Sequence, residues 1–266
     1  MKKKIFLISS VFLIFPIIVL AHQPRISNQP VSVVDNPEIS KAYYSKLSGG
    51  PQVYKISSDN DFVLYINILV PDVVSQKKDF KVTLIKEEDL GSKNIVVLDG
   101  NNFVWTKFFE PYGHDTYFKG PEYKAKVSAG EYSIIVSNDL NDSKYALAIG
   151  EKENFNFKET MNALRLVPKL KNTFFDKSPA GFIFSPFGWG LLVTLSLFVI
   201  VIYFPFRFLL KKYFKSFLLK IKNKHYLRII EFLLGLGLLL LSIFTSWNIW
   251  LLLLAISLIF ESIFWV

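Results

Sequence analysis

The C-terminal part of this sequence is a long, almost uncharged apolar run. Between Ile229 and Val266 the sequence has only two charged side chains, Glu231 and Glu261. A single helix of this length would measure about 57 Å, whereas the hydrocarbon core of a bilayer is about 30 Å thick. A polar break at residues 245–248 therefore predicts two transmembrane helices, 229–245 and 249–266, joined as a hairpin. Both are short for a full crossing, so a re-entrant hairpin stays open as an alternative.

Two further apolar segments lie upstream. Residues 186–205 carry no charge and are long enough to cross a bilayer, with Trp189 where an interfacial aromatic residue is expected. The N-terminus has three lysines, an apolar run and a small residue at position 21, which is typical of a secretory signal peptide over residues 1–21. An uncleaved anchor is the alternative, and both place the following residues outside the cytoplasm.

The charge distribution supports this topology. The formal net charge is +9, yet residues 22–185 contain 20 Lys/Arg and 20 Asp/Glu. The excess cations lie at Lys2, Lys3 and Lys4 and in the segment 207–228, which flank apolar runs. Cationic loops stay on the cytoplasmic side, so we expect a multi-pass protein of the plasma membrane with its N-terminal domain extracytoplasmic. A polar region without net positive charge also argues against a nucleic-acid partner.

Residues 206–228 are expected to form a basic amphipathic helix on the cytoplasmic leaflet. Apolar residues fall on one helical face and most lysines on the other, which is typical of a helix that binds lipid head groups. The lysines expected at the membrane surface are Lys211, Lys212, Lys215 and Lys222. In the following helix, Gly235 and Gly237 are expected to let two helices approach closely.

Residues 51–150 alternate between apolar and polar side chains in short runs separated by turn residues. This pattern predicts about eight strands, and a two-sheet sandwich is the economical way to bury one face of each. We therefore expect an extracytoplasmic all-β sandwich followed by an α-helical transmembrane region. Residues 22–50 read as a linker in which Val31 to Val34 could add an edge strand. Residues 151–185 read as a juxtamembrane connector, with a helix over Phe157 to Val167 that Pro168 ends.

Reactive constellations are scarce. His114 lies beside Glu110 and Asp115, a weak candidate metal site, but one histidine without ligand spacing favours a structural role. With no cysteine and no nucleophile elbow, phosphate loop, dinucleotide fingerprint or zinc motif, we expect neither an enzyme nor a cofactor.

An aromatic-rich stretch, residues 103–123, is the other candidate site. Exposed rings could stack on a glycan or grip a protein, whereas at least half should point into the core. The candidate partner-binding residues are Trp105, Tyr112 and Tyr117.

The segments Ala129 to Val136 and Lys144 to Glu151 form a pattern that resembles the last strand pair of bacterial extracellular β-sandwich modules, pre-peptidase C-terminal domains among them. It is similar as well to uncharacterised bacterial membrane proteins that combine a signal, such a module and C-terminal helices. The resemblance covers about 100 residues and implies a sandwich fold. It carries over no functional residue, because the acidic calcium-binding positions of some such modules have no counterpart here.

The leading hypothesis is a non-catalytic cell-surface protein, anchored in lipid, whose sandwich binds a protein or a glycan. An alternative is an accessory subunit of a membrane transporter or complex that docks through the C-terminal helices. A metal-binding protein or an enzyme is the third hypothesis.

Overall fold

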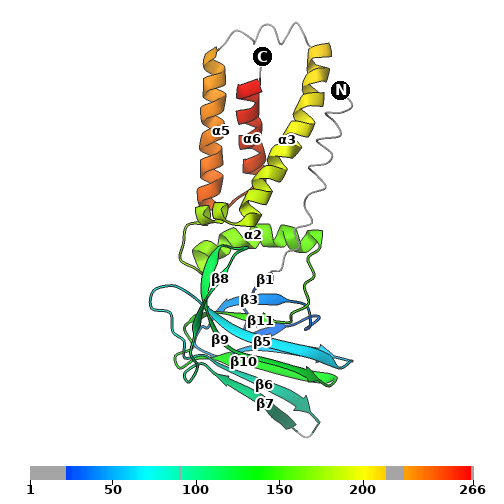
Figure 1. Ribbon diagram of the computed structural model, residues 1–266, viewed down its shortest axis with the longest axis vertical. Coiled ribbons are helices and arrows are strands. Elements are labelled where there is room, and N and C mark those ends of the chain that lie inside the picture. The colour runs from blue at the N-terminus through cyan, green and yellow to red at the C-terminus, as the bar shows by residue number, and fades with distance from the viewer. Residues whose placement is uncertain (1–21, 90, 214–224, 265–266) are drawn as a thin grey trace.

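The computed structural model describes residues 22–89, 91–213 and 225–264. The protein is built in layers that follow one another along its long axis (Figure 1). A five-stranded sheet, sheet B, lies at one end, and a six-stranded sheet, sheet A, packs on it. Helix α2 crosses the far side of sheet A, and three apolar helices rise from the layer of α2 (Figure 1).

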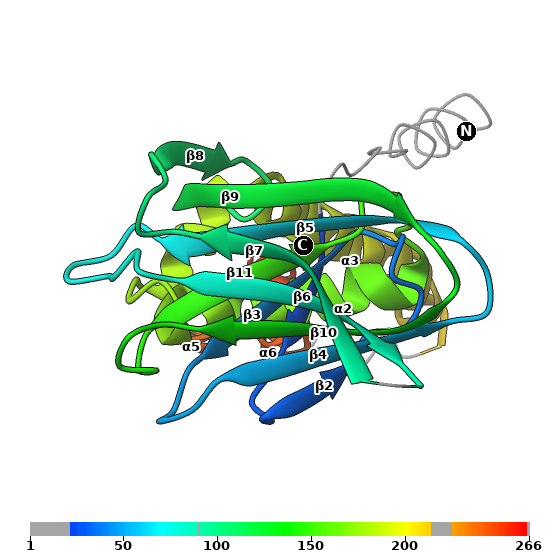
Figure 2. The ribbon, with the colours of Figure 1, turned by 90° about the horizontal axis from the view of Figure 1, so that it is seen from below.

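The described residues form eleven strands. The strands of sheet A, in spatial order, are β1 (Gln23–Ile26), β3 (Lys41–Lys46), β11 (Lys144–Ile149), β5 (Phe62–Pro71), β9 (Asp115–Val127) and β8 (Thr106–Glu110). Those of sheet B are β2 (Val31–Val33), β4 (Gln52–Ser58), β10 (Gly130–Ser137), β6 (Lys81–Glu88) and β7 (Gly91–Asp99). Figure 2 shows the two sheets from the side of sheet B, with the helices behind them.

The sandwich core lies where the two sheets face each other. Alternate residues of β5, such as Leu64, Ile66 and Ile68, are fully buried there, and those of β10, such as Ile134 and Val136, meet them from the other sheet. Period-two alternation therefore reports the core correctly. All eight strands expected between residues 51 and 150 are present, so that part of the prediction is confirmed.

The linker predicted over residues 22–50 is wrong. This segment supplies three strands, and it enters both sheets: β1 pairs in parallel with β3, and β2 pairs in parallel with β4. Strand β2 is the expected edge strand. Strand β3 shows no alternation because most of its side chains, on both faces, are buried. A strand covered on both faces carries no period-two signal.

The connector predicted over residues 151–185 is also more than a connector. Helix α2 (Phe157–Thr173) continues through Pro168, and a short 3₁₀ helix, η1 (Pro179–Phe184), follows. Proline removes one hydrogen bond and costs about 3 kcal/mol inside a helix. Leu170, Lys171 and Phe174, which come after the proline, are all buried, and this packing offsets the loss.

Three apolar helices complete the chain: α3 (Pro186–Tyr213), α5 (His225–Thr245) and α6 (Ile249–Phe264). Within α3 and α5, the segments Pro186–Phe206 and Tyr226–Thr245 are long and apolar enough to cross a membrane, and α6 is a shorter apolar helix. The expected break at residues 245–248 is the turn between α5 and α6. A separate helix over 206–228 is not found: residues 206–213 continue α3, residues 225–228 begin α5, and residues 214–224 lie outside the described residues.

Helices α5 and α6 pack closely at Gly235. A Cβ atom added there would lie 2.9 Å from Ile259 Cγ1 and 3.0 Å from the carbonyl oxygen of Ala255, so the glycine prediction is confirmed at this position. At Gly237 an added Cβ would meet nothing within 4 Å, so the prediction is wrong there.

Candidate functional site

The seam between sheet A and α2 holds two of the residues that the sequence singled out, Asp115 and Tyr117. Its apolar part consists of side chains from three strands and the end of α2; we call it the docking seam. The buried members are Leu69, Tyr117, Ala146, Ala148, Leu170, Phe174 and Phe175. Both faces of the central strands of sheet A are therefore buried, one against sheet B and one against α2.

Local interactions fix the start of α2 against the sheet. The side chain of Asn156 caps the helix by accepting a hydrogen bond from the backbone N–H of Glu159 at 2.9 Å. The Glu159 carboxylate in turn accepts two hydrogen bonds, at 2.8 and 2.9 Å, from the guanidinium of Arg25 in β1. This two-point contact joins the first strand to a helix more than 130 residues away in the sequence.

A buried ion pair fixes the other end of α2. Lys171 Nζ lies 2.9 Å from Asp115 Oδ2 and donates a second hydrogen bond, at 2.6 Å, to the carbonyl oxygen of Gly113. The side chains of Lys171 and Asp115 are 1% and 3% exposed. Lys177 Nζ, which is 45% exposed, approaches the other oxygen of Asp115 at 3.4 Å.

The turn between β8 and β9 holds the three candidate metal ligands, and each is engaged elsewhere. Both oxygens of Glu110 accept backbone hydrogen bonds, from Tyr112 at 2.8 Å and from Gly113 at 2.6 Å. Asp115 pairs with two lysines, and the exposed ring of His114 packs edge-on against Phe109. Within the described residues no group of three or more His, Cys, Asp or Glu side chains could hold a metal ion.

Glu110, His114 and Asp115 lie close together because they form and flank the tight turn between β8 and β9. His114 has φ +59°, a left-handed conformation that a four-residue turn needs and that a non-glycine residue adopts at some cost. Burial raises the pKa of Glu110, while hydrogen bonds from Gly113 and Tyr112 act in the opposite direction. The turn is thus held in shape by its own carboxylate.

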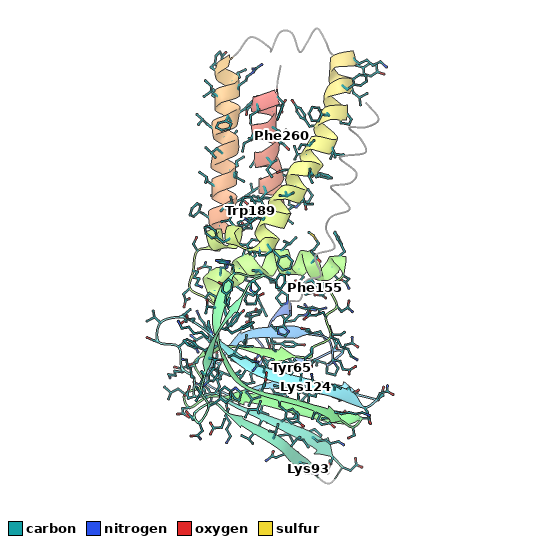
Figure 3. All side chains as sticks on the ribbon, viewed as in Figure 1. Tyr65, Lys93, Lys124, Phe155, Trp189 and Phe260 are labelled. Atoms are coloured by element: carbon teal, nitrogen blue, oxygen red, sulfur yellow. The ribbon has the colours of Figure 1, made fainter. Side chains whose placement is uncertain are left out.

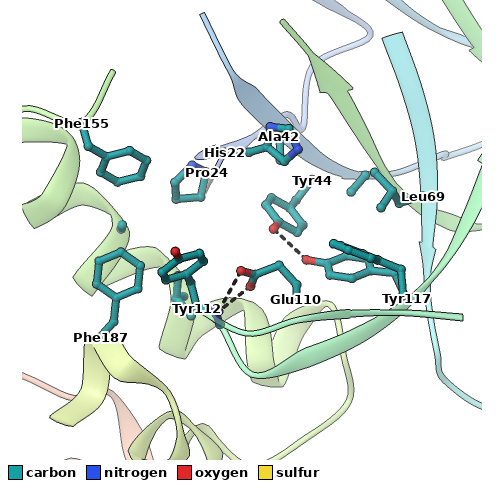
Figure 4. Close-up of a pocket in the computed structure, with 15 residues that line it drawn as sticks. His22, Pro24, Ala42, Tyr44, Leu69, Glu110, Tyr112, Tyr117, Phe155 and Phe187 are labelled. Atoms are coloured by element: carbon teal, nitrogen blue, oxygen red, sulfur yellow. Dashed lines mark hydrogen bonds between the residues drawn. The ribbon is translucent and has the colours of Figure 1, made fainter. Parts of the chain in front are cut away.

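A small cavity lies behind this turn, between sheet A, α2 and the start of α3 (Figure 4). The hydroxyls of Tyr44 and Tyr117 share a hydrogen bond of 2.8 Å beside it, and burial raises the pKa of both phenols. Burial also lowers the pKa of His22, on the same wall. The cavity holds only ≈ 60 Å³, far below the roughly 300 Å³ at which pockets for small organic ligands begin. It is a packing gap of the seam.

The three candidate partner-binding residues lie at different depths. Tyr117 is 4% exposed in the docking seam, so its ring is not available to an outside partner and that prediction is wrong. Tyr112 is half-buried against Phe187 at the start of α3. Trp105 is half-buried on the sandwich core, and its indole N–H donates to the carbonyl oxygen of Gly100 at 2.8 Å.

Exposed rings lie instead on β8, one of the two edge strands of sheet A. Phe108 and Phe109 are 42% and 49% exposed, and Phe103 in the preceding loop is 42% exposed. Adjacent residues of a strand point to opposite faces, so the doublet at 108–109 was the signal that one ring must leave any core. This signal was missed because tryptophan and tyrosine residues, and not phenylalanines, were chosen as candidates.

The candidate membrane-surface lysines are only partly described. Lys211 and Lys212 belong to the last turns of α3, at the end far from the sandwich, whereas Lys215 and Lys222 lie outside the described residues. Trp189 lies near the other end of α3, the end nearer the sandwich (Figure 3).

Comparisons with known proteins add the fold neighbours alone. No protein-family model matches the chain, and neither does any curated protein. Similar solved structures include the pre-peptidase C-terminal domain of a Bacillus anthracis collagenase, the class of module that the strand pair resembles. It is 12% identical, spans 47% of this chain and 95% of its own, and has a TM-score of 0.29.

Two further neighbours are a mitogen from Yersinia pseudotuberculosis and CorA, a surface-associated copper-binding protein from Methylomicrobium album BG8. The mitogen is 12% identical over 45% of this chain and 92% of its own, with a TM-score of 0.30. CorA is 8% identical over 48% of this chain and 100% of its own, with a TM-score of 0.25. Likenesses this distant carry no argument about function.

Proposed function

We propose that this chain is a multi-pass protein of the plasma membrane whose extracytoplasmic sandwich binds a macromolecular partner without catalysis. The observation that carries the membrane part is the opposite character of the two ends of the apolar helices. At the sandwich end, Trp189 and Trp250 are 58% and 79% exposed, as expected of interfacial aromatic residues. At the far end, α3 carries Arg207, Lys211 and Lys212, which favours the cytoplasmic side.

In this orientation α3, α5 and α6 cross the bilayer and α2 lies in the outer interface. Only 22% and 17% of the apolar spans in α3 and α5 are buried, and their exposed side chains are mostly apolar, which suits contact with lipid tails. With 16 residues, α6 spans about 24 Å, a little less than the hydrocarbon core. Local thinning of the bilayer accommodates such a difference at modest cost.

Labelling of single cysteines tests this topology, because the natural chain has no cysteine. Lys93→Cys on the sandwich and Ser246→Cys at the hairpin tip should react with a membrane-impermeant maleimide in intact cells. Lys212→Cys should react only after the cells are permeabilised. Labelling of position 212 in intact cells would show that the topology is the reverse of the one proposed. Protection of position 246 would favour a re-entrant hairpin.

Edge strand β8 supports a protein rather than a glycan as the partner. Among the described residues it pairs with β9 on one side only, so the N–H and C=O groups on its other side are open to a strand of another chain. Its phenylalanines are exposed on both faces, where an added strand would place its own side chains. Catalysis is not part of the proposal, since the polar groups of the seam are occupied in holding the fold.

Photo-crosslinking in cells tests the proposed surface. A benzoyl-phenylalanine at Phe109 should give a discrete adduct that Phe108→Lys abolishes. The same probe at Val97, which is 44% exposed on edge strand β7 of sheet B, is the matched control and should give none. Equal adducts at both positions, or none at 109, would contradict the proposal, and binding of the purified full chain to a glycan array would change the class of the partner.

A second candidate function is an accessory subunit that docks through its helices. The observation in its favour is the exposed apolar surface of α3, which includes Phe198, Val201 and Phe204 at 47–53% exposure. Lipid explains the same surface equally well. Co-purification of an integral membrane protein that is lost when residues 229–266 are deleted would favour this role, and an unchanged association would oppose it.

A further inference from the structure

Helix α2 presents a stripe of cations that the fold leaves without partners. Lys158, Arg165 and Lys169 are spaced seven and four residues apart, which places them on one face of the helix. All three are exposed, and no ion pair or hydrogen bond joins their head groups to another described residue. By contrast, the acidic residue of the first turn, Glu159, is taken up by Arg25. The stripe is therefore uncompensated positive charge.

A groove lies where this stripe meets the hairpin. It has a volume of ≈ 550 Å³ between α2 and the turn that joins α5 to α6. Arg165 and Asn162 line one wall, and Asn248 and Trp250 line the other. Its volume falls in the range of pockets that hold small organic groups, and its lining joins a cation and amides to apolar surface.

We propose that this groove binds the phosphate group of an anionic phospholipid in the outer leaflet. The inference rests on the membrane orientation proposed above, which puts α2 and Trp250 at the depth of the head groups. A guanidinium matches two phosphate oxygens, so Arg165 is the central contact, and Lys158 and Lys169 add to the local positive potential. The indole of Trp250 lies against the glycerol region, the usual place of interfacial tryptophan.

The test uses the full chain in phosphatidylcholine nanodiscs that contain a small, fixed fraction of brominated lipid. Bromine quenches tryptophan fluorescence on contact, and the part of the quenching that Trp250→Phe removes reports the groove. The Trp250 fluorescence should be quenched equally at a several-fold lower content of brominated phosphatidylglycerol than of brominated phosphatidylcholine in the nanodisc. Arg165→Gln should reduce this preference about five-fold, the effect of about one cation at an anionic surface.

Two variants separate the groove from general charge. Arg165→Lys keeps a cation and should retain most of the preference, whereas Lys93→Gln removes an exposed cation at the far end of sheet B (Figure 3) and should change nothing. Equal quenching by both lipids, or equal loss in Arg165→Gln and Lys93→Gln, would overturn the inference. So would loss of the preference when inorganic phosphate is added at millimolar concentration, because a free anion would then be the ligand. Failure of the chain to enter nanodiscs would instead refute the membrane orientation.

Discussion

The buried pair of Lys171 and Asp115 should control how firmly the sandwich is held to the helical layer. Lys171 belongs to α2 and Asp115 is the first residue of β9, so the pair joins the helix to sheet A beside the β8–β9 turn. Replacing Asp115 with alanine would leave the Lys171 ammonium at 1% exposure with the carbonyl oxygen of Gly113 as its remaining partner. A buried charge that loses its counter-ion is the costly case.

The size of the effect follows from that burial. Removing one member of a buried pair costs about 3–5 kcal/mol. For a chain of this size each kcal/mol lowers the unfolding midpoint by about 2–4 °C, so Asp115→Ala should lower it by roughly 6–20 °C. Adding Lys171→Met removes the stranded ammonium and should restore much of the loss, because an apolar side chain of similar length suits the site.

Thermal unfolding of the full chain in nanodiscs, followed by circular dichroism of the strands, measures these shifts. The matched control is Asp72→Ala, which breaks the solvent-exposed pair of Asp72 and Lys107 and should cost at most about 1 kcal/mol. If Asp115→Ala were no more harmful than Asp72→Ala, or if Lys171→Met made it worse, the pair would not be the desolvated contact that its exposure indicates.

Three further predictions use the same assay. Gly120→Ala should destabilise the sandwich by about 1–3 kcal/mol, because its Cβ would lie 2.5 Å from the Trp105 ring; an unchanged midpoint would show that the ring moves freely. Gly235→Leu should loosen the α5–α6 hairpin and lower the midpoint at which the helical signal is lost, while Gly237→Leu leaves that midpoint unchanged; equal effects would contradict the packing. Burial raises the pKa of Glu110 above 4.5. The stability that Glu110 contributes is therefore full below pH 4.5 and is lost as the pH rises through the folded-state pKa. The Glu110→Gln variant does not titrate at this position, so it should gain stability relative to the natural chain as the pH rises above 4.5. A stability difference that stays constant as the pH rises from below 4.5 to well above it would refute this assignment.

The sequence predicted the sandwich where apolar and polar side chains alternate along a strand. The first half of β5, from Phe62 to Ile66, alternates between buried and more exposed residues, and β5 and β10 both lie within residues 51–150, where strands were expected. Strand β3 was missed because side chains on both of its faces are buried, and β1 because it is short and polar. Parallel pairing over long loops, as in β1 with β3, leaves no local turn signal either.

The continuation of α2 through Pro168 was missed for a different reason. Local propensity ends a helix before proline, whereas here the residues that follow are buried on sheet A. Likewise, no local pattern pairs Lys171 with Asp115, since they are 56 residues apart and meet only after α2 docks. The sequence offered His114 and its acidic neighbours as chemistry, and the fold uses two of them, Glu110 and Asp115, as structural supports.

The ion pairs between sheet A and α2 bear on the proposed function because they hold the sandwich in a fixed position relative to the helices. A sandwich on a flexible linker would present every edge strand to a partner at any angle. Here β1 is tied to α2 through Arg25 and Glu159, and β9 is tied to it through Asp115 and Lys171. Two such ties at separate points of sheet A resist both tilting and rotation. Strand β8 is therefore held at a fixed distance from the layer of α2, so in the membrane orientation proposed above a partner that adds to this edge would have to reach close to the bilayer.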